Sequence, residues 1–257
     1  MTDLATIADH LDALLGTASV PDYAGALNGL QLANRSPILR VAASVDISRR
    51  VIDRAIEAEA NLLIVHHGMF WGGTQPVVGA TYDRLRLLIT HDVAVYASHL
   101  PLDAHPSLGN NVLLARTLGL EPTGGFARFK TIDVGVQGTS DVATMTLRHR
   151  ADTFARLHGG AVRSTPIPAD HRTRRWAICT GAGASSETLV EAQSQRVDTL
   201  IVGEGPHHTA VAADDAGIVV IYAGHYATET LGVRAVADHL TTTFGVPSVF
   251  IEAPTGL

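Results

Sequence analysis

The chain repeats one pattern twice, and this internal duplication constrains its fold more than any other feature. The apolar run at residues 61–68 ends in His66, His67 and a glycine, and its counterpart at residues 198–205 ends in a glycine, Glu204 and a glycine. Residues 96–103 pair with residues 222–229 in the same way. The duplication predicts two similar halves that both contribute to one metal site, because the repeated positions carry metal-binding residue types.

Composition is typical of a soluble globular chain, and anionic partners would have to be bound locally. The 257 residues are 46% hydrophobic and 17% charged, enough for one large domain or two small ones. The formal net charge is −6 without a long basic tract, so we expect no general nucleic-acid binding. The chain shows neither a bilayer-spanning apolar stretch nor the features of a signal peptide. We therefore predict a cytoplasmic protein that does not bind membranes.

Cys179 is the single cysteine, which excludes an intrachain disulfide and a zinc site built from several cysteines. It ends the apolar run 176–179. We interpret it as a small buried hydrophobic residue rather than a catalytic thiol.

Hydrophobic periodicity predicts an α/β fold with mostly parallel sheets. An amphipathic helix begins after Thr2 or Asp3 and ends near Gly16. Short apolar runs then alternate with helical patterns, as in parallel sheets covered by helices. The predicted strands are 41–45, 62–65, 93–97, 176–179, 199–202 and 218–222, and the predicted helices are 49–60, 82–90, 110–118, 186–194, 208–214 and 228–242.

The same patterns predict three segments. Residues 1–121 form a first α/β lobe, and residues 176–257 form a second lobe whose C-terminal part packs on the first. Residues 122–175 form a junction with peripheral strands at 131–136 and 143–147 and a short helix at 153–158.

Metal-binding and titratable side chains collect just past the ends of the predicted strands. This edge of an open parallel α/β sheet is where ligands bind. The residues concerned are His66, His67, His99, Asp103, Glu204, His225 and Glu229. Singly, each has a structural alternative: Asp103 could cap a turn or helix, and Glu229 could stabilise a helix start. Together they favour a metal site.

We interpret five of these residues as the metal ligands: His66, His67, Asp103, His225 and Glu229. Such a set serves two ions only if one carboxylate bridges them, and it leaves coordination incomplete, as in catalytic sites. Two divalent cations would leave a local charge of about +2, which suits an anionic substrate and acidifies a bound water. Nitrogen and oxygen donors suit Zn, Fe, Mn or Co without choosing among them.

His99 and Glu204 are the remaining members of the duplication. His99 aligns with His225, and Glu204 aligns with His67. They either orient the metal ligands or transfer protons as a general acid or base.

The order of the motifs resembles that of a known family. The motifs are residues 28–31, 65–68, 99–103, 109–111, 203–204 and 224–229. From about residue 20 to the C-terminus, the sequence resembles the Nif-three-like dinuclear metal-centre family, whose members are often named GTP cyclohydrolase 1 type 2 homologues.

The resemblance implies that His66 and His225 bind one ion, that His67 and Asp103 bind the other, and that Glu229 bridges the two. It also implies two similar α/β lobes enclosing the metal site and a homohexamer built as a trimer of dimers. The modest segment 122–175 marks the short form of the family, without the large inserted domain.

Two functions fit these observations. The first is a dinuclear metal-dependent hydrolase that acts on a phosphorylated or nucleotide-like small molecule, with Glu204 or His99 moving protons. The second is a non-catalytic metal-binding regulatory or interaction protein, in which the ions set conformation or assembly. Incomplete metal coordination favours the enzyme, with an anionic small molecule as its substrate.

Overall fold

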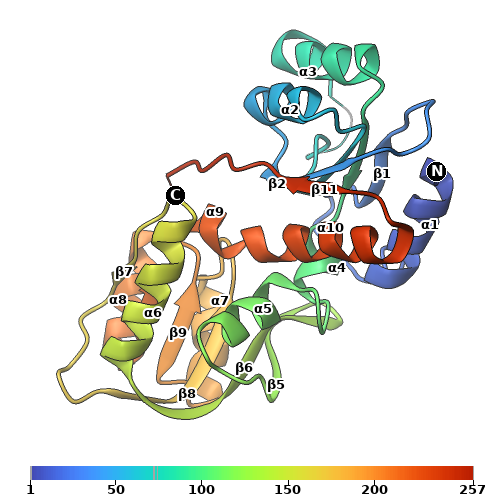
Figure 1. The fold of residues 1–257 in the computed structure, drawn as a ribbon. Helices are drawn as coiled ribbons and strands as arrows, with labels where there is room; N and C mark the ends of the chain where they lie inside the picture. The colour runs from blue at the N-terminus through green and yellow to red at the C-terminus, as the bar shows by residue number, and fades with distance from the viewer. Residues whose placement is uncertain (1, 72, 74, 257) are drawn as a thin grey trace. The chain divides into compact units, whose positions relative to one another are not determined.

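The computed structural model describes residues 2–71, 73 and 75–256, and the chain forms two compact units (Figure 1). Unit 1 comprises Met1–Leu102 and Gly232–Ala253, and unit 2 comprises Asp103–Leu231 and Pro254–Leu257. Each unit contains its own mixed sheet, and the centre of each sheet is parallel. The predicted α/β fold is confirmed.

Unit 1 has a sheet in the order β1-β4-β3-β2-β11, in which β1 runs antiparallel to β4 and the other neighbours are parallel. Figure 1 shows β11, in red, beside the blue β2. The strands are β1 (Gly29–Leu32), β2 (Val41–Asp46), β3 (Leu62–His67), β4 (Ala94–Ala97) and β11 (Ser248–Phe250). The helices are α1 (Leu4–Leu15), α2 (Arg49–Glu57) and α3 (Gly79–Thr90), together with most of α4 (Leu100–Asp103) and α10 (Thr230–Phe244).

Local sequence explains these elements. The side chain of Asp3 accepts a hydrogen bond from N of Thr6 and so caps α1, which ends at Gly16 with a φ of 66°. The first five residues of both β2 and β3 are buried, as expected for central parallel strands covered on both faces. One face of the sheet packs on Val51 and Ile52 of α2 and on Leu88 of α3.

Unit 2 has a sheet in the order β5-β6-β8-β9-β10-β7, with β8, β9 and β10 parallel to one another. Its strands are β5 (Gly124–Phe129), β6 (Ile132–Ala143), β7 (Arg163–Ser164), β8 (Arg172–Cys179), β9 (Thr199–Val202) and β10 (Val219–Tyr222). Its helices are α5 (Asn110–Thr117), α6 (Thr144–Leu157), α7 (Ser186–Ser194), α8 (His207–Asp215) and α9 (His225–Thr228). Trp176 on one face packs with α5 and α6, and Leu200 on the other packs with α7 and α8.

The internal duplication is visible in the sheets. In unit 1 an antiparallel edge strand is followed by β4, β3 and β2, and in unit 2 the edge strand β7 is followed by β10, β9 and β8. Asn61 and Asp198 are equivalent residues, and each accepts backbone hydrogen bonds in its unit. Oδ1 of Asn61 accepts from N of Leu39 at 2.8 Å, and Oδ2 of Asp198 accepts from N of Arg174 at 3.0 Å. Each side chain thereby ties the start of one central strand to the start of the next.

The equivalence of His99 and His225 is wrong by one residue. N of Ser98 donates to O of Val65 at 3.0 Å, and N of Ala223 donates to O of Val202 at 2.8 Å. Since Val65 and Val202 are equivalent, Ala223 corresponds to Ser98, and the next residue, a glycine, corresponds to His99. That glycine has a φ of 91°, which glycine adopts readily, and it leads the chain into α9.

The structure also corrects two boundaries. Residues 143–147 were expected to form a strand, but α6 begins at Thr144 because Leu147, Ala151 and Phe154 are buried at helical spacing. The compact units divide at 102/103 and 231/232 rather than at 121 and 175. The reason is that β5 and β6 are hydrogen-bonded into the sheet of unit 2, whereas β11 is hydrogen-bonded to β2.

No helix in the described part of the chain is long and apolar enough to cross a membrane.

Candidate metal centre

In unit 1, His66 and His67 occupy the last positions of β3. His66 is fully buried, and its Nδ1 lies 2.9 Å from O of Ser98. Nδ1 of His67 lies 2.8 Å from Oδ1 of Asp46, at the end of the neighbouring strand β2. Carbonyl and carboxylate oxygens only accept hydrogen bonds, so each imidazole carries its proton on Nδ1 and its lone pair on Nε2.

His99, just after β4, is held by two residues from the N-terminal loop. Its Nδ1 lies 2.9 Å from Oδ1 of Asp22, and its N donates to Oδ1 of Asn28 at 2.7 Å. Nδ2 of Asn28 donates in turn to Oδ2 of Asp22 at 2.8 Å. Burial alone would raise the pKa of Asp22, but the hydrogen bonds from His99 and Asn28 lower it overall. Asp22 is therefore a fixed anion behind the imidazole.

These three imidazoles converge. His66, His67 and His99 each offer a ring nitrogen, and the three nitrogens lie within 4.8 Å of one another. The ring centroids are 4.8 Å apart for His66 and His67, and 5.0 Å apart for His66 and His99. A group of imidazoles with aligned lone pairs fits a borderline divalent ion such as Zn²⁺ or Fe²⁺.

In unit 2, His225 is held between two carboxylates. Its Nδ1 lies 2.7 Å from Oε1 of Glu204, and its Nε2 lies 3.2 Å from Oε2 of Glu229. Burial alone would lower the pKa of His225, but the contacts with Glu229 and Glu204 outweigh it and raise the pKa to about 9. A pair of a buried carboxylate and an imidazole of this kind also fits a divalent cation.

Asp103 belongs to the same unit. It is 6% exposed, and its Oδ1 accepts from Nδ2 of Asn110 at 2.8 Å. Burial raises the pKa of the Cys179 thiol to about 12, and the charges of Asp103 and Glu229 contribute to the rise. Both predicted carboxylate ligands therefore lie near Cys179.

Glycine makes room for this group. A Cβ on Gly181 would collide with the carboxylate of Glu229 and would lie 3.3 Å from Nε2 of His225. N of Gly181 also donates to Oγ1 of Thr228 at 3.1 Å. The loop after β8 can approach His225 and Glu229 because residue 181 has no side chain.

The structure thus groups the predicted residues by unit. It brings together His66, His67 and His99 in unit 1, and His225, Glu229 and Glu204 in unit 2. Sequence reasoning missed Asp22 and Asp46, which hold two of the imidazoles. The position of Asp46 at the end of a predicted strand was a usable signal, whereas Asp22 lies in a loop without one.

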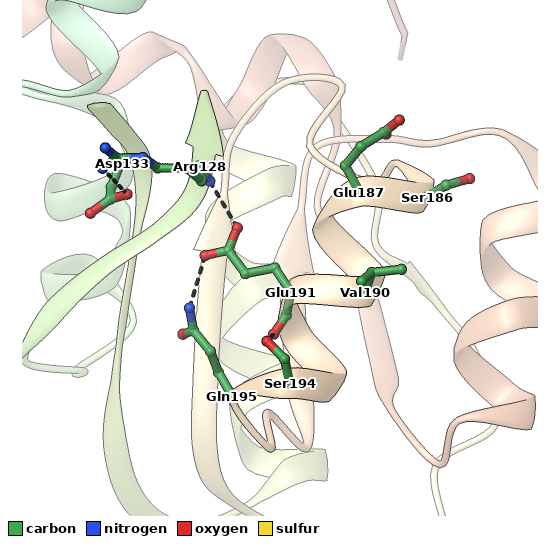
Figure 2. Close-up of a pocket in the computed structure, with 8 residues that line it drawn as sticks. All are labelled: Arg128, Asp133, Ser186, Glu187, Val190, Glu191, Ser194 and Gln195. Atoms are coloured by element: carbon green, nitrogen blue, oxygen red, sulfur yellow. Dashed lines mark hydrogen bonds and ion pairs between the residues drawn. The ribbon is translucent and has the colours of Figure 1, made fainter. Parts of the chain in front are cut away.

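Another hollow lies away from the predicted site residues. It measures about 670 Å³ and lies between the β5–β6 hairpin and α7 (Figure 2). Oε2 of Glu191 accepts from N of Arg128 at 2.8 Å there, and Oε1 of Glu191 accepts from Nε2 of Gln195 at 2.9 Å. None of the predicted site residues lines it.

Comparisons with known proteins agree with the fold and the motifs. The model of the family Duf34/NIF3 (NGG1p interacting factor 3) matches residues 2–255. A Deinococcus radiodurans protein named GTP cyclohydrolase 1 type 2 homolog is 40% identical, over 90% of this chain and 86% of the relative. A Pyrococcus abyssi protein of the same name is 38% identical, over 98% of each chain. The crystal structure of a Thermus thermophilus protein, TTHA1606, is 34% identical and matches with a TM-score of 0.84 over 100% of both chains.

Proposed function

The chain belongs to the Duf34/NIF3 family, and from that premise we propose that it is a metal-dependent hydrolase that acts on a phosphorylated or nucleotide-like small molecule. The names of its relatives support a GTP cyclohydrolase type of reaction, in which a ring of an anionic substrate is opened by hydrolysis.

One observation carries this proposal. Each of the four candidate imidazoles has its Nδ1 held by an oxygen acceptor: Ser98 O for His66, Asp46 for His67, Asp22 for His99 and Glu204 for His225. Metal-binding histidines nearly always donate their second ring N–H to a carboxylate, a carbonyl or water. This repeated arrangement favours metal ligation by Nε2 of His66, His67 and His225, and it leaves Nε2 of His99 oriented toward the same group.

We propose two divalent ions, held by the five residues that the sequence predicted: His66, His67, Asp103, His225 and Glu229. Bound divalent ions supply Lewis acidity and lower the pKa of a coordinated water. The chain contributes the imidazole lone pairs and the buried carboxylates, which partly neutralise the ions and leave a net positive site for an anionic substrate.

Glu204 and His99 take different parts in this proposal. Glu204 acts through His225, whose Nδ1 it holds at 2.7 Å, and is therefore a positioning residue. The side chain of Glu204 is still 41% exposed, so it can also exchange a proton with solvent. Nε2 of His99 carries a lone pair beside His66 and His67 and can accept a proton from a reacting group.

Assembly and compartment stay proposals, kept from the sequence and from the family resemblance. We propose a homohexamer, a trimer of dimers, in the cytoplasm.

The test is elemental analysis of protein purified without added metal, combined with a hydrolysis screen on nucleotides and phosphorylated metabolites. Wild-type protein should carry about two ions per chain, and His67→Ala and Glu229→Ala should lose metal and turnover together. His149→Ala, which changes an exposed histidine on α6, is the control and should change neither. Stoichiometric metal without turnover of any compound would instead favour a metal-binding regulatory protein.

A further inference from the structure

A cavity of about 350 Å³ lies in unit 2, at the carboxyl ends of β9 and β10. This volume is at the lower end of the range for small-molecule pockets, and the edge is the one at which parallel α/β sheets bind ligands. Glu204 and Gly224 both line it, one hydrogen bond and one residue away from His225. The lining residues used below are Arg163, Glu204, Pro206, His207, Ala210 and Tyr222.

The positive charge of Arg163 at this cavity is not balanced by an ion pair with a described residue. Arg163 lies directly opposite Tyr222 in the antiparallel pair β7–β10, so the two side chains extend from the same face of the sheet. Arg163 is exposed and makes no side-chain ion pair with any described residue. His207 begins α8, whose N-cap residue Pro206 supplies no side-chain hydrogen bond. Glu204 is the acidic side chain among the lining residues, and its Oε1 lies 2.7 Å from Nδ1 of His225. The helix dipole adds to the attraction for an anion.

The hydroxyl of Tyr222 has no hydrogen-bond partner among the described residues. Its hydroxyl oxygen is buried, and among the described residues no group donates to it or accepts from it. A buried hydroxyl without a partner is unfavourable in a folded protein and points to a ligand or water. Tyr222 lines the cavity, and its ring packs against the core cluster that contains Leu200 and Val220.

The equivalent place in unit 1 is filled. Gly68 corresponds to Gly205, and the hollow that Gly68 lines together with Gln31 has no volume left for a ligand. Oε1 of Gln31 accepts from N of Met69 at 2.8 Å, and its Nε2 donates to O of Leu27 at 2.6 Å. The side chain of Gln31, on edge strand β1, fills the place in unit 1. The two-residue edge strand β7 has no equivalent side chain. The cavity is therefore not a requirement of the duplicated fold.

We infer that this cavity binds the phosphate group of a small phosphorylated ligand. Arg163 and His207 meet the phosphate charge, the hydroxyl of Tyr222 donates a hydrogen bond to a phosphate oxygen, and Ala210 and Pro206 contact the organic part. The inference rests on the proposed function in one respect: it names the substrate class as a phosphomonoester whose phosphate is held beside His225.

The experiment measures binding rather than turnover. The full chain is stripped of metal with EDTA, dialysed and titrated by calorimetry with phenyl phosphate, and with phenol as the uncharged control. Wild-type protein should bind phenyl phosphate and not phenol. Arg163→Ala should weaken binding about tenfold, and Tyr222→Phe by a smaller factor. Arg174→Ala, an exposed arginine on β8, should bind as wild type.

A second readout excludes misfolding as the cause. Since the hydroxyl of Tyr222 has no partner among the described residues, Tyr222→Phe should be at least as stable as wild type without ligand and should gain less Tm when phenyl phosphate is added. Ala210→Glu, which adds a carboxylate to the cavity wall, should abolish binding.

The outcomes separate this inference from the proposed function. Equal affinity in wild type, Arg163→Ala and Tyr222→Phe, or binding that occurs only in metal-loaded protein, would overturn the phosphate subsite and leave the hydrolase intact. Binding that depends on Arg163, in a protein that turns over no phosphorylated compound, would support the subsite and count against the hydrolase.

Discussion

Nδ1 of His225 lies 2.7 Å from Oε1 of Glu204, although the two residues are 21 positions apart. The contact connects the end of β9 with the start of α9, and it sets the tautomer of the imidazole. On the other side of the ring, Nε2 of His225 lies 3.2 Å from Oε2 of Glu229, so the imidazole is held from both sides. Glu204 therefore fixes the orientation of the His225 ring.

The first prediction follows from this contact. Glu204→Ala should lower metal affinity about 10- to 100-fold, because the imidazole loses the acceptor that orients it. Glu204→Gln should retain most of the affinity, since an amide oxygen still accepts from Nδ1. Competition for Zn²⁺ with a chromophoric chelator measures both. Glu57→Ala, an exposed carboxylate on α2, is the control, and an unchanged affinity in Glu204→Ala would contradict the positioning role.

The second prediction concerns the loop beside Glu229. Gly181 and Gly217 have similar φ values, 62° and 70°, but a Cβ on Gly181 would strike the carboxylate of Glu229, whereas nothing lies within 4 Å of one on Gly217. Gly217→Ala should cost about 1 kcal/mol of unfolding free energy through backbone strain alone. Gly181→Ala should cost more and should also reduce bound metal.

Urea unfolding and metal analysis of these two variants separate strain from collision. Gly217→Ala is the matched control, because it carries the strain without the contact. Equal losses of stability and full metal content in both variants would show that the close approach at Gly181 is unimportant.

The sequence predicted the fold well where the evidence is local. Central strands such as β3 and β9 are short apolar runs, which the sequence alone identifies. Their duplication is detectable in the sequence because equivalent positions have the same structural role. The prediction of a strand at 143–147 was wrong. Polar and apolar residues alternate there as in a strand, but the burial of Leu147 and Ala151 favours a helix. That choice is made by tertiary packing, which periodicity over a few residues does not contain.

The candidate site was predictable only in part. The duplicated motifs identified histidines at the ends of strands, and in the structure His66, His67 and His99 lie close together. Their partners were not visible. Asp22 is 77 residues from His99 and Asp46 is 21 residues from His67, so only the folded sheet brings each carboxylate to its imidazole.

The third prediction tests the structural duplication at Asn61 and Asp198. Each side chain accepts hydrogen bonds from two successive backbone N–H groups, those of Leu39 and Arg40 just before β2 in one unit and those of Arg174 and Arg175 in β8 in the other. Asn61→Ala and Asp198→Ala should each lower the free energy of unfolding by about 1–3 kcal/mol, because these N–H groups lose their acceptor.

Asp198→Asn should cost much less than Asp198→Ala, since Asn61 shows that an amide oxygen serves this position. Chemical denaturation monitored by circular dichroism gives the comparison. Equal losses in Asp198→Asn and Asp198→Ala would mean that the charge of Asp198, and not its role as an acceptor, stabilises unit 2.

The fourth prediction concerns Cys179, which is buried at 9% exposure between the sheet and α7. Burial, reinforced by the charges of Asp103 and Glu229, raises the pKa of its thiol from 9.0 to about 12. The neutral thiol is therefore retained in the folded state, whereas the unfolded chain ionises near pH 9. The contribution of this group to stability is complete below pH 9 and is lost as the pH rises from there toward 12.

The same shift predicts reactivity, because the thiolate is the nucleophile. At pH 8, metal-free native protein should react with a disulfide reagent such as DTNB far more slowly than the same protein in denaturant. A Cys179→Ser chain that carries Ser194→Cys, at an exposed position on α7, is the matched control and should react at once in the native state. If native Cys179 is labelled as fast as this control, the thiol is accessible and ionised. That result would support a catalytic role for Cys179 over its interpretation as a buried hydrophobic residue.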